Sequence, residues 1–440
     1  MKKMRFLNTN RTLNNAMWII GCRVIQAFLN LLITMFTARF LGPSNFGLIN
    51  YAMSLVAFVT PVMQMGLTSI IVQELILNPQ KEGKILGSSI TSCMISAALS
   101  TVGVMSFVSV ANFGETETII VCGLYCLTLF AQALEIILYW FQAHLLSRYS
   151  SVVSLGCYLI VAAYKFYLLL FQKSVYWFAV ANALDFFLIS VFLLIIYKKQ
   201  GGQKLGFSFD LCKQMINKGK YYILSGLMVA VFAQTDRVML KLMVDDAATG
   251  FYSAAVTCAG MTGFVFCAII DSARPAIFQS KKCSNESFER NMKCVYSIVI
   301  YCALLQSLFI TVLAKPVVYI LYGETYIPTI NALRIIVWYT TFSYIGAVRN
   351  IWILAEEKQS MIWKIDTPGA LANIVLNAVL IPRYGINGAA IASLLTQFFT
   401  NILMGWILPD IRRNNTLILQ SLNPQILIKE VHKLIHRKTS

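Results

Sequence analysis

Residues 175–197 read VYWFAVANALDFFLISVFLLIIY, an apolar run with only scattered polar side chains. An α-helix needs about 20 residues to cross the roughly 30 Å hydrocarbon core of a bilayer, and this run has that length. Comparable runs predict about twelve membrane-spanning helices, at 16–38, 46–70, 86–110, 119–141, 151–171, 175–197, 221–244, 250–279, 294–314, 329–355, 360–382 and 385–407. Ten-residue blocks of alternating hydrophobicity, the pattern of an outer-membrane barrel, do not occur. The sequence therefore predicts an all-α polytopic membrane protein.

The composition of the 440-residue chain supports the same class. Hydrophobic residues make up 58% and charged residues only 12%, about half the charged share of a soluble globular domain. A water-soluble protein of this composition could not cover its surface with polar groups, and a disordered chain would not be this apolar. The 11 Cys show neither metal-site spacing nor a disulfide framework, so we expect no metal site.

The distribution of Lys and Arg predicts the orientation. If the N-terminus lies in the cytoplasm, the cytoplasmic segments carry 24 of the 36 Lys and Arg, and the outer loops carry five. This asymmetry follows the positive-inside rule and predicts that both termini are cytoplasmic (N-in/C-in). For the same reason, the net charge of +17 indicates orientation in a membrane and no nucleic-acid partner. The basic tail is expected to contact anionic membrane lipids.

The widest hydrophilic break suggests two lobes of six helices. A Gly opens the second helix of each lobe, at Gly47 and at Gly250, which is a short internal similarity. With an even number of spans per lobe, a repeat would be parallel, about an axis along the membrane normal. Four parts are predicted: a first lobe at 1–197, a basic cytoplasmic linker at 198–220, a second lobe at 221–407 and a basic cytoplasmic tail at 408–440.

The familiar catalytic motifs are absent. The chain has no G-x-x-x-x-G-K-[ST] phosphate loop, no H-E-x-x-H and no G-x-S-x-G sequence, and it contains only three His. We therefore expect no catalytic residue and no cofactor. The predicted outer loops are short, which disfavours an enzyme that assembles polymers on the outer face.

Twelve charged residues fall inside the predicted spans. Each would cost about 2.5–3.5 kcal/mol at the centre of a bilayer, roughly 30 kcal/mol in sum, so they predict a polar interior. Seven are positive and five are negative: Arg23, Lys165, Arg237, Arg274, Arg334, Arg349 and Lys364; Glu135, Asp185, Asp236, Asp271 and Asp366.

Four of the cations lie at a similar predicted depth. Arg23, Arg274, Arg349 and Lys364 fall within roughly 10 Å of the cytoplasmic boundary, at 1.5 Å per residue. If they face one cavity, they form a cationic vestibule suited to a phosphate or pyrophosphate group, because Arg offers a bidentate fork. The alternative is that they reach lipid phosphates or pair locally, as Arg274 can with Asp271 at i, i+3.

The intramembrane carboxylates are candidates for ion coupling. A carboxylate in a hydrated cavity can bind H⁺ or Na⁺ and drive a conformational cycle, so Glu135, Asp185 and Asp236 are assigned this role. For Glu135 and Asp185, structural pairing with Lys165 is the alternative. Arg237, adjacent to Asp236, should point away from it and is added to the substrate-binding candidates.

Four stretches resemble a known family when they are taken in order: ARFLGPSNFG at 38–47, QTDRVML at 234–240, LYGETY at 321–326 and LIPRYGINGAA at 380–390. They resemble the polysaccharide-transporter family of the multidrug/oligosaccharidyl-lipid/polysaccharide exporter superfamily, and Wzx-type O-antigen flippases in particular. The resemblance extends over nearly the whole chain. Of the motif residues, only Asp236 and Arg237 are polar inside a predicted span.

The resemblance implies both a fold and a function. Two six-helix bundles would open alternately and move undecaprenyl-pyrophosphate-linked oligosaccharide units across the bacterial inner membrane. It also implies contact with the O-antigen polymerase machinery. Two alternatives remain open: an ion-coupled drug antiporter of the same superfamily, which would need an acidic cavity, and a membrane-embedded polysaccharide polymerase.

Overall fold

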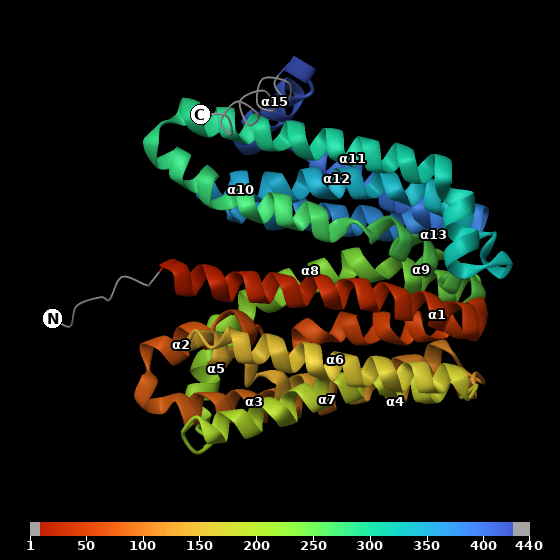
Figure 1. Cartoon of the computed structure of the whole chain (residues 1–440). Helices are drawn as coiled ribbons and strands as arrows, with labels where there is room; N and C mark the ends of the chain where they lie inside the picture. Colours follow the sequence, from red (N-terminus) through yellow and green to blue (C-terminus); the bar gives the residue numbers. More distant parts are fainter. Residues whose placement is uncertain (1–8, 426–440) are drawn as a thin grey trace. The chain divides into compact units, whose positions relative to one another are not determined.

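The computed structural model describes residues 9–425, without the side chains of residues 9–20, 23, 24, 69 and 221. Over this range the chain consists of helices and the short loops that join them, with no strand (Figure 1). Eight of the described helices are long and apolar enough to cross a membrane, or nine if one bent pair counts as a single span. The all-α polytopic fold is therefore confirmed, and the count of twelve spans stays a prediction.

Two of the long helices each contain a sharp break. α1 (Thr9–Met63) breaks at Gly42, where φ is 73°, and α13 (Ser360–Phe398) breaks at Gly385, where φ is 54°. Glycine adopts such positive φ values readily because it has no Cβ. The breaks fall where the sequence separates two pairs of predicted spans.

The chain divides into two compact units, Met1–Gln234 and Thr235–Ser440. The division lies inside α8 (Phe209–Met243) and not in the predicted linker at 198–220. The physical reason is that this segment packs on the first unit: Gly206 N–H donates to the Gly83 carbonyl at 3.1 Å, and the chain is helical again from Phe209.

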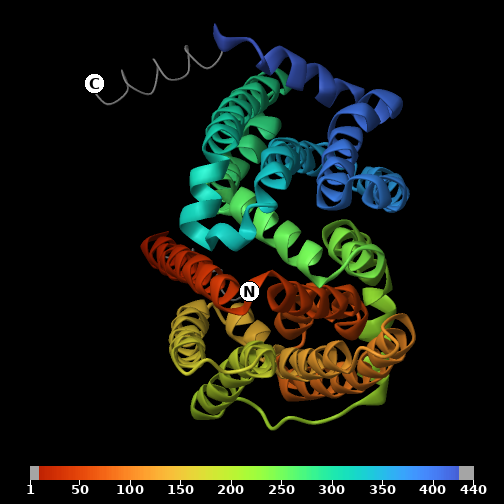
Figure 2. The same cartoon turned by 90° about the vertical axis from the view of Figure 1, so that its right-hand side faces the viewer.

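The first unit is a helical bundle, seen along its helices in Figure 2. α4 packs along α7, and α1 packs against both α4 and α6. Buried aliphatic side chains such as Leu129 and Leu193 fill the space between these helices. Besides α1, its helices are α2 (Ile71–Leu77), α3 (Glu82–Ala111), α4 (Thr116–Glu135), α5 (Leu138–Ala143), α6 (Ser147–Leu170) and α7 (Val175–Lys199).

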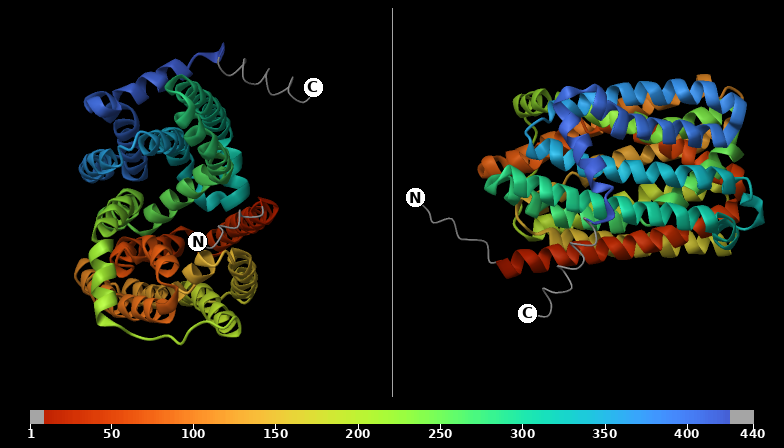
Figure 3. Two further views of the ribbon diagram at one scale, coloured as in Figure 1. Left: turned by 90° about the vertical axis from the view of Figure 1, so that its left-hand side faces the viewer. Right: turned by 90° about the horizontal axis from the view of Figure 1, so that it is seen from above.

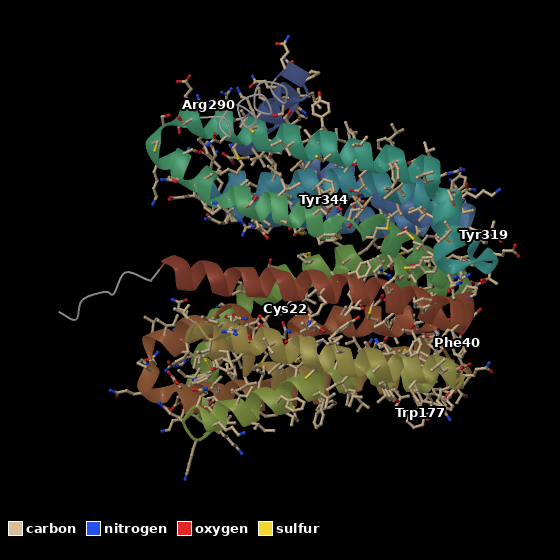
Figure 4. All side chains as sticks on the ribbon, viewed as in Figure 1. Cys22, Phe40, Trp177, Arg290, Tyr319 and Tyr344 are labelled. Atoms are coloured by element: carbon tan, nitrogen blue, oxygen red, sulfur yellow. The ribbon has the colours of Figure 1, made fainter. Side chains whose placement is uncertain are left out.

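The second unit is built around α12, which packs against α9, α11 and α13. α15 packs on α11 and runs across the direction of the long helices (Figure 3). Figure 4 shows Arg290 and Tyr319 at opposite ends of α11. Besides α13, its helices are α9 (Asp246–Gly260), α10 (Gly263–Cys283), α11 (Asn285–Tyr322), α12 (Thr329–Ala355), α14 (Met404–Ile407) and α15 (Arg412–Ser421).

Two predicted spans of this unit are not regular helices. The predicted span 250–279 is divided into α9 and α10, which are bent by 43°. Gln306 Nε2 donates to the Ala259 carbonyl at 3.3 Å and so satisfies one backbone acceptor beside this break. The predicted span 385–407 contains a π-helical turn, η4 (Phe399–Leu403). By contrast, α13 continues through Pro368.

Candidate functional site

A polar cavity of about 400 Å³ lies in the first unit. Its polar lining comes from four helices: Gln26 and Asn30 of α1, Glu135 of α4, Ser154 and Tyr158 of α6, and Asp185 of α7. At about 30 Å³ per water molecule, this volume holds a small hydrated cation but not a lipid-linked oligosaccharide. The structure thus brings together two of the three predicted ion-coupling carboxylates.

Helical spacing explains how these side chains meet. Gln26 and Asn30 are four residues apart on α1, as are Ser154 and Tyr158 on α6, so each pair lies on one helix face. The two faces also touch, because Tyr158 Oη donates to Asn30 Oδ1 at 3.4 Å. The neutral lining residues were not predicted as one site, although their spacing is visible in the sequence.

The two carboxylates of the cavity are not equivalent. Glu135 ends α4, and it lies close enough to Asp185 for the two charges to repel each other. Asp185 Oδ1 is shielded from solvent and has no hydrogen-bond partner among the described residues. An acceptor left in this state is costly in a low-dielectric interior, so it favours a bound cation or proton.

Lys165 lies beside the cavity but bonds to a neutral group. Its Nζ donates to Asn182 Oδ1 at 2.9 Å, and Asn182 Nδ2 donates to Tyr125 Oη at 2.6 Å. Lys165 and Asp185 act on each other electrostatically without forming an ion pair within 4.0 Å. Where the sequence suggests an ion pair between Lys165 and a carboxylate, the structure shows a hydrogen bond to the Asn182 amide.

The third predicted ion-coupling carboxylate, Asp236, is in the second unit and is only 5% exposed. It accepts hydrogen bonds from Tyr252 Oη of α9 and Ser393 Oγ of α13. It also accepts from Asn377 Nδ2 at 2.6 Å and from Asn373 Nδ2 at 3.3 Å. This four-donor cluster satisfies the carboxylate, whereas Asn377 Oδ1 in the same cluster is buried and has no partner.

The break in α13 makes the Asp236 cluster possible. Asn373 and Asn377 precede Gly385, and Ser393 follows it, so the bend at Gly385 lets both arms of α13 reach one carboxylate. Gly388 supports the close return, because a Cβ there would collide with the Leu380 carbonyl. Tyr252 and Ser393 are neutral, so the charge pattern of the sequence does not indicate them.

Arg237 diverges from Asp236, as predicted for adjacent helical residues. Its Nε donates to Ser253 Oγ at 3.1 Å on α9, and its side chain is half-buried. A second hydrogen bond joins the two helices: Thr249 Oγ1 donates to the Arg237 carbonyl at 3.4 Å. Arg237 thus helps to join α8 to α9 within the second unit.

Arg349 is an internal residue of the second unit and is only 3% exposed. One guanidinium nitrogen donates to the Thr400 carbonyl at 2.8 Å, and another donates to Asn350 Oδ1 at 3.1 Å. Thr400 belongs to the π-helical turn, in which the backbone bonds are shifted from the regular i→i−4 pattern. Arg349 therefore fixes the irregular turn to α12.

The other predicted cations are more accessible. Arg274 is 48% exposed and pairs with Asp271 at 3.1 Å, which confirms the predicted i, i+3 contact. Lys364 is exposed at the start of α13. Arg23 lies on α1, but its side chain is outside the described residues. In the second unit, Arg349 is internal whereas Arg274 and Lys364 are at the surface, so the three do not share one exposed face.

No metal centre accompanies these groups. Among the residues that the structure describes, no three His, Cys, Asp or Glu side chains come together in an arrangement that could hold a metal ion.

Comparisons with known proteins agree with this architecture. A relative from Shigella flexneri, described as an O-antigen transporter, is 21% identical over 90% of this chain and 97% of its own length. The lipid II flippase MurJ, in an inward closed conformation, is similar in structure with a TM-score of 0.75 at 13% identity, over 94% of this chain and 92% of that one. An inward-facing multidrug resistance MATE transporter of the MOP superfamily gives a TM-score of 0.64 at 13% identity, over 90% of this chain and 96% of that one.

The fold is thus that of the MOP exporter superfamily, as the sequence motifs indicated. The chain is a multi-pass membrane protein. The family described as polysaccharide biosynthesis protein matches residues 12–281, which is more than half of the chain, and the chain therefore belongs to this family.

Proposed function

We propose that this chain is a flippase that moves undecaprenyl-pyrophosphate-linked O-antigen repeat units from the cytoplasmic to the periplasmic leaflet of the bacterial inner membrane. The observation that carries the proposal is the likeness over nearly the whole chain to a lipid II flippase and to a protein described as an O-antigen transporter. A function in polysaccharide biosynthesis agrees with the family. The two units would rock against each other and expose the substrate path alternately to either side.

The accessible cations are the proposed ligands of the pyrophosphate. Arg274 and Lys364 are exposed on the second unit, Arg237 is half-buried there, and α1 carries Arg23. A guanidinium binds phosphate oxygens through two parallel N–H donors, each a charge-assisted hydrogen bond. Arg349 acts indirectly, because it is buried and two of its three guanidinium nitrogens bond to Thr400 and Asn350, which holds the π-helical turn in place.

The cavity of the first unit is the proposed coupling site. Glu135 and Asp185 would take up one H⁺ or Na⁺, and its binding would favour one conformation of the transporter over the other. The Asp236 cluster is a second candidate, supported by the unpartnered Asn377 Oδ1. A cation there would require the Asn373 and Asn377 amides to turn their oxygens toward it, since both now donate to Asp236.

Deletion of the gene in a strain that makes O-antigen tests the flippase. The deletion strain should accumulate single lipid-linked repeat units on the cytoplasmic face, and the intact chain should restore surface O-antigen. The Arg274→Gln variant should restore at least tenfold less surface O-antigen than the intact chain, because a hydrogen bond from a charged group to the pyrophosphate contributes about 1.5–3 kcal/mol. Arg290→Gln, at an exposed position on α11, is the matched control and should restore fully. Full complementation by the Gln variants of Arg274, Arg237 and Lys364 would refute the pyrophosphate site.

The same strain separates the alternative functions. A drug antiporter is supported by the likeness to the MATE transporter, and it predicts drug sensitivity with unchanged O-antigen after deletion. A polymerase predicts that single repeat units accumulate on the periplasmic face. The side of accumulation therefore distinguishes the flippase from a polymerase.

A further inference from the structure

Among the described residues, Lys165 is the cation that interacts electrostatically with the cavity carboxylate Asp185, but it forms no ion pair with it. Its Nζ bonds to Asn182 Oδ1 at 2.9 Å, while Asp185 lies three residues further along α7 on the same helix face. Asp185 Oδ1 keeps no partner. A lysine side chain is long and has several rotatable bonds, so its ammonium can move between Asn182 and Asp185 without a change in the backbone.

The charges around the cavity nearly balance. Glu135 and Asp185 contribute two negative charges, and Lys165 contributes one positive charge, which leaves one negative charge among the described side chains. The other titratable groups that face these three are Tyr125, Tyr139, Cys157 and Tyr158, which are neutral in the physiological range. Counting the described side chains alone, one monovalent cation would make the loaded cavity neutral.

We infer that Lys165 is a positioning residue that sets the coupling stoichiometry of this cavity at one monovalent cation per cycle. The inference rests on the proposed function and deepens it. The structure shows the ammonium on Asn182, and we assign this position to the state in which a proton or Na⁺ occupies the carboxylates. When the cation leaves, the Lys165 ammonium is drawn to Asp185 and takes the place of the cation. The interior then avoids two uncompensated carboxylates in either state, which a low dielectric would penalise heavily.

A purely structural role for Lys165 would be to join α6 to α7 through Asn182. Such a role predicts an effect of substitution on stability alone. The inference predicts a change in cation affinity and in the number of cations bound, because removing Lys165 leaves a cavity with two negative charges. Charge-conserving and charge-restoring variants separate the two roles.

The experiment measures the thermal unfolding of the purified full-length chain while Na⁺ replaces choline at constant ionic strength, and separately while pH changes. Stabilisation by a bound cation follows its concentration relative to its Kd, so the titration gives the affinity. Lys165→Met should lower the Kd for Na⁺ at least about tenfold and make the rise of stability with log[Na⁺] steeper than for one site. Lys165→Arg should behave like the wild type, and so should Lys173→Met, which removes a lysine in an exposed loop.

The double variant Lys165→Met, Asp185→Asn restores one net negative charge and should return to a single-site dependence. Arg23 is unchanged in every variant, so its contribution cancels in the comparison. If the Kd of Lys165→Met for Na⁺ lies within twofold of the wild-type value, the inference is overturned. If Lys165→Met does not fold, the double variant decides: a folded protein with single-site dependence supports the inference, and an unfolded one overturns it.

Failure of the proposed ion coupling gives a different result. In that case the stability of the wild type itself does not rise with Na⁺ and does not depend on pH through the cavity carboxylates, and the inference about Lys165 is overturned too. If the wild type responds and Lys165→Met responds identically, ion coupling at the cavity stands and only the role of Lys165 is refuted.

Discussion

Asp185 and Asp236 have the same functional group and opposite surroundings. Asp236 accepts from Tyr252, Ser393, Asn373 and Asn377, so its charge is stabilised by the protein itself. Asp185 has an oxygen without a partner and faces a cavity. A carboxylate that still needs a partner can respond to a cation, whereas a satisfied one mainly holds helices together. On this ground, Asp185 is the better candidate for ion coupling.

Removal of the Asp236 carboxylate should destabilise the second unit strongly. In Asp236→Ala, four buried donors lose their acceptor, and each unsatisfied group costs about 1–3 kcal/mol, partly recovered by new bonds among the donors. We expect a net loss of about 3 kcal/mol or more, measured by denaturant or thermal unfolding in detergent. Asp271→Ala is the control, because Asp271 is 65% exposed and its pair with Arg274 should contribute less than about 1 kcal/mol. Equal stability of the two variants would contradict the assigned role of the cluster.

The charge pattern revealed some of these residues in advance, but not all of them. Glu135, Asp185 and Asp236 stand out in the sequence because a charge in an apolar run demands a polar environment. Tyr252 and Ser393 do not, since neutral hydroxyl groups are common in membrane helices. Tyr252 meets Asp236 across 16 residues because α9 turns back along α8, and Ser393 meets it across 157 residues because α13 bends at Gly385. Hydropathy carries no information about such contacts.

At the scale of elements, the last helices of the second unit are held together by polar side chains. α15 docks through Asn415, whose Nδ2 donates to the Ile402 carbonyl at 2.6 Å, and through Asn414, whose Oδ1 accepts from Tyr296 Oη at 2.7 Å. Ile402 and Thr400 both belong to the π-helical turn, and Thr400 accepts from Arg349. The irregular turn is thus fixed by α12 on one side and by α15 on the other.

The contact between Gly405 and Asn415 gives a test of this docking. A Cβ at Gly405 would collide with the Asn415 side chain, so Gly405→Ala should displace α15 and cost about 1–3 kcal/mol of stability. Limited proteolysis should then cut near Arg412 and Arg413 at least several-fold faster. Gly103→Ala is the control: Gly103 is also helical but has open space around it, and Ala there should be neutral or slightly stabilising. Unchanged proteolysis of Gly405→Ala would show that α15 does not depend on this contact.

Regular elements follow from the apolar runs, and irregular ones do not. The predicted span 329–355 coincides with α12 (Thr329–Ala355), and the span 175–197 ends two residues short of α7 (Val175–Lys199). The break between α9 and α10 and the π-helical turn lie inside equally apolar runs. Both change the backbone hydrogen-bond pattern without changing hydrophobicity, so a count of apolar residues cannot detect them.

At the scale of the whole molecule, each compact unit contains its own polar site. The first unit has the cavity with Glu135 and Asp185, and the second has the Asp236 cluster. This arrangement suits a transporter in which each unit moves largely as a rigid body, because the polar groups remain satisfied or hydrated within a unit during the motion. Charges at the surfaces of the units, such as Arg274, then remain available to the substrate.

The distribution of Lys and Arg predicts the orientation of the molecule, and this prediction can be measured directly. The predicted N-in/C-in topology places Cys283, beside Lys281 and Lys282, in the cytoplasm and Lys173 outside. Cys283 is exposed and free, so a variant in which Cys267 and Cys302, the other exposed Cys of the described chain, are replaced by Ala reports its location. A membrane-impermeant maleimide should label Cys283 in inside-out vesicles and not in intact spheroplasts. Lys173→Cys, combined with Cys283→Ser, should show the opposite pattern. Labelling of Cys283 in intact spheroplasts would reverse the topology and would place Arg274 and Lys364 at the periplasmic side, where they could not receive a substrate from the cytoplasm.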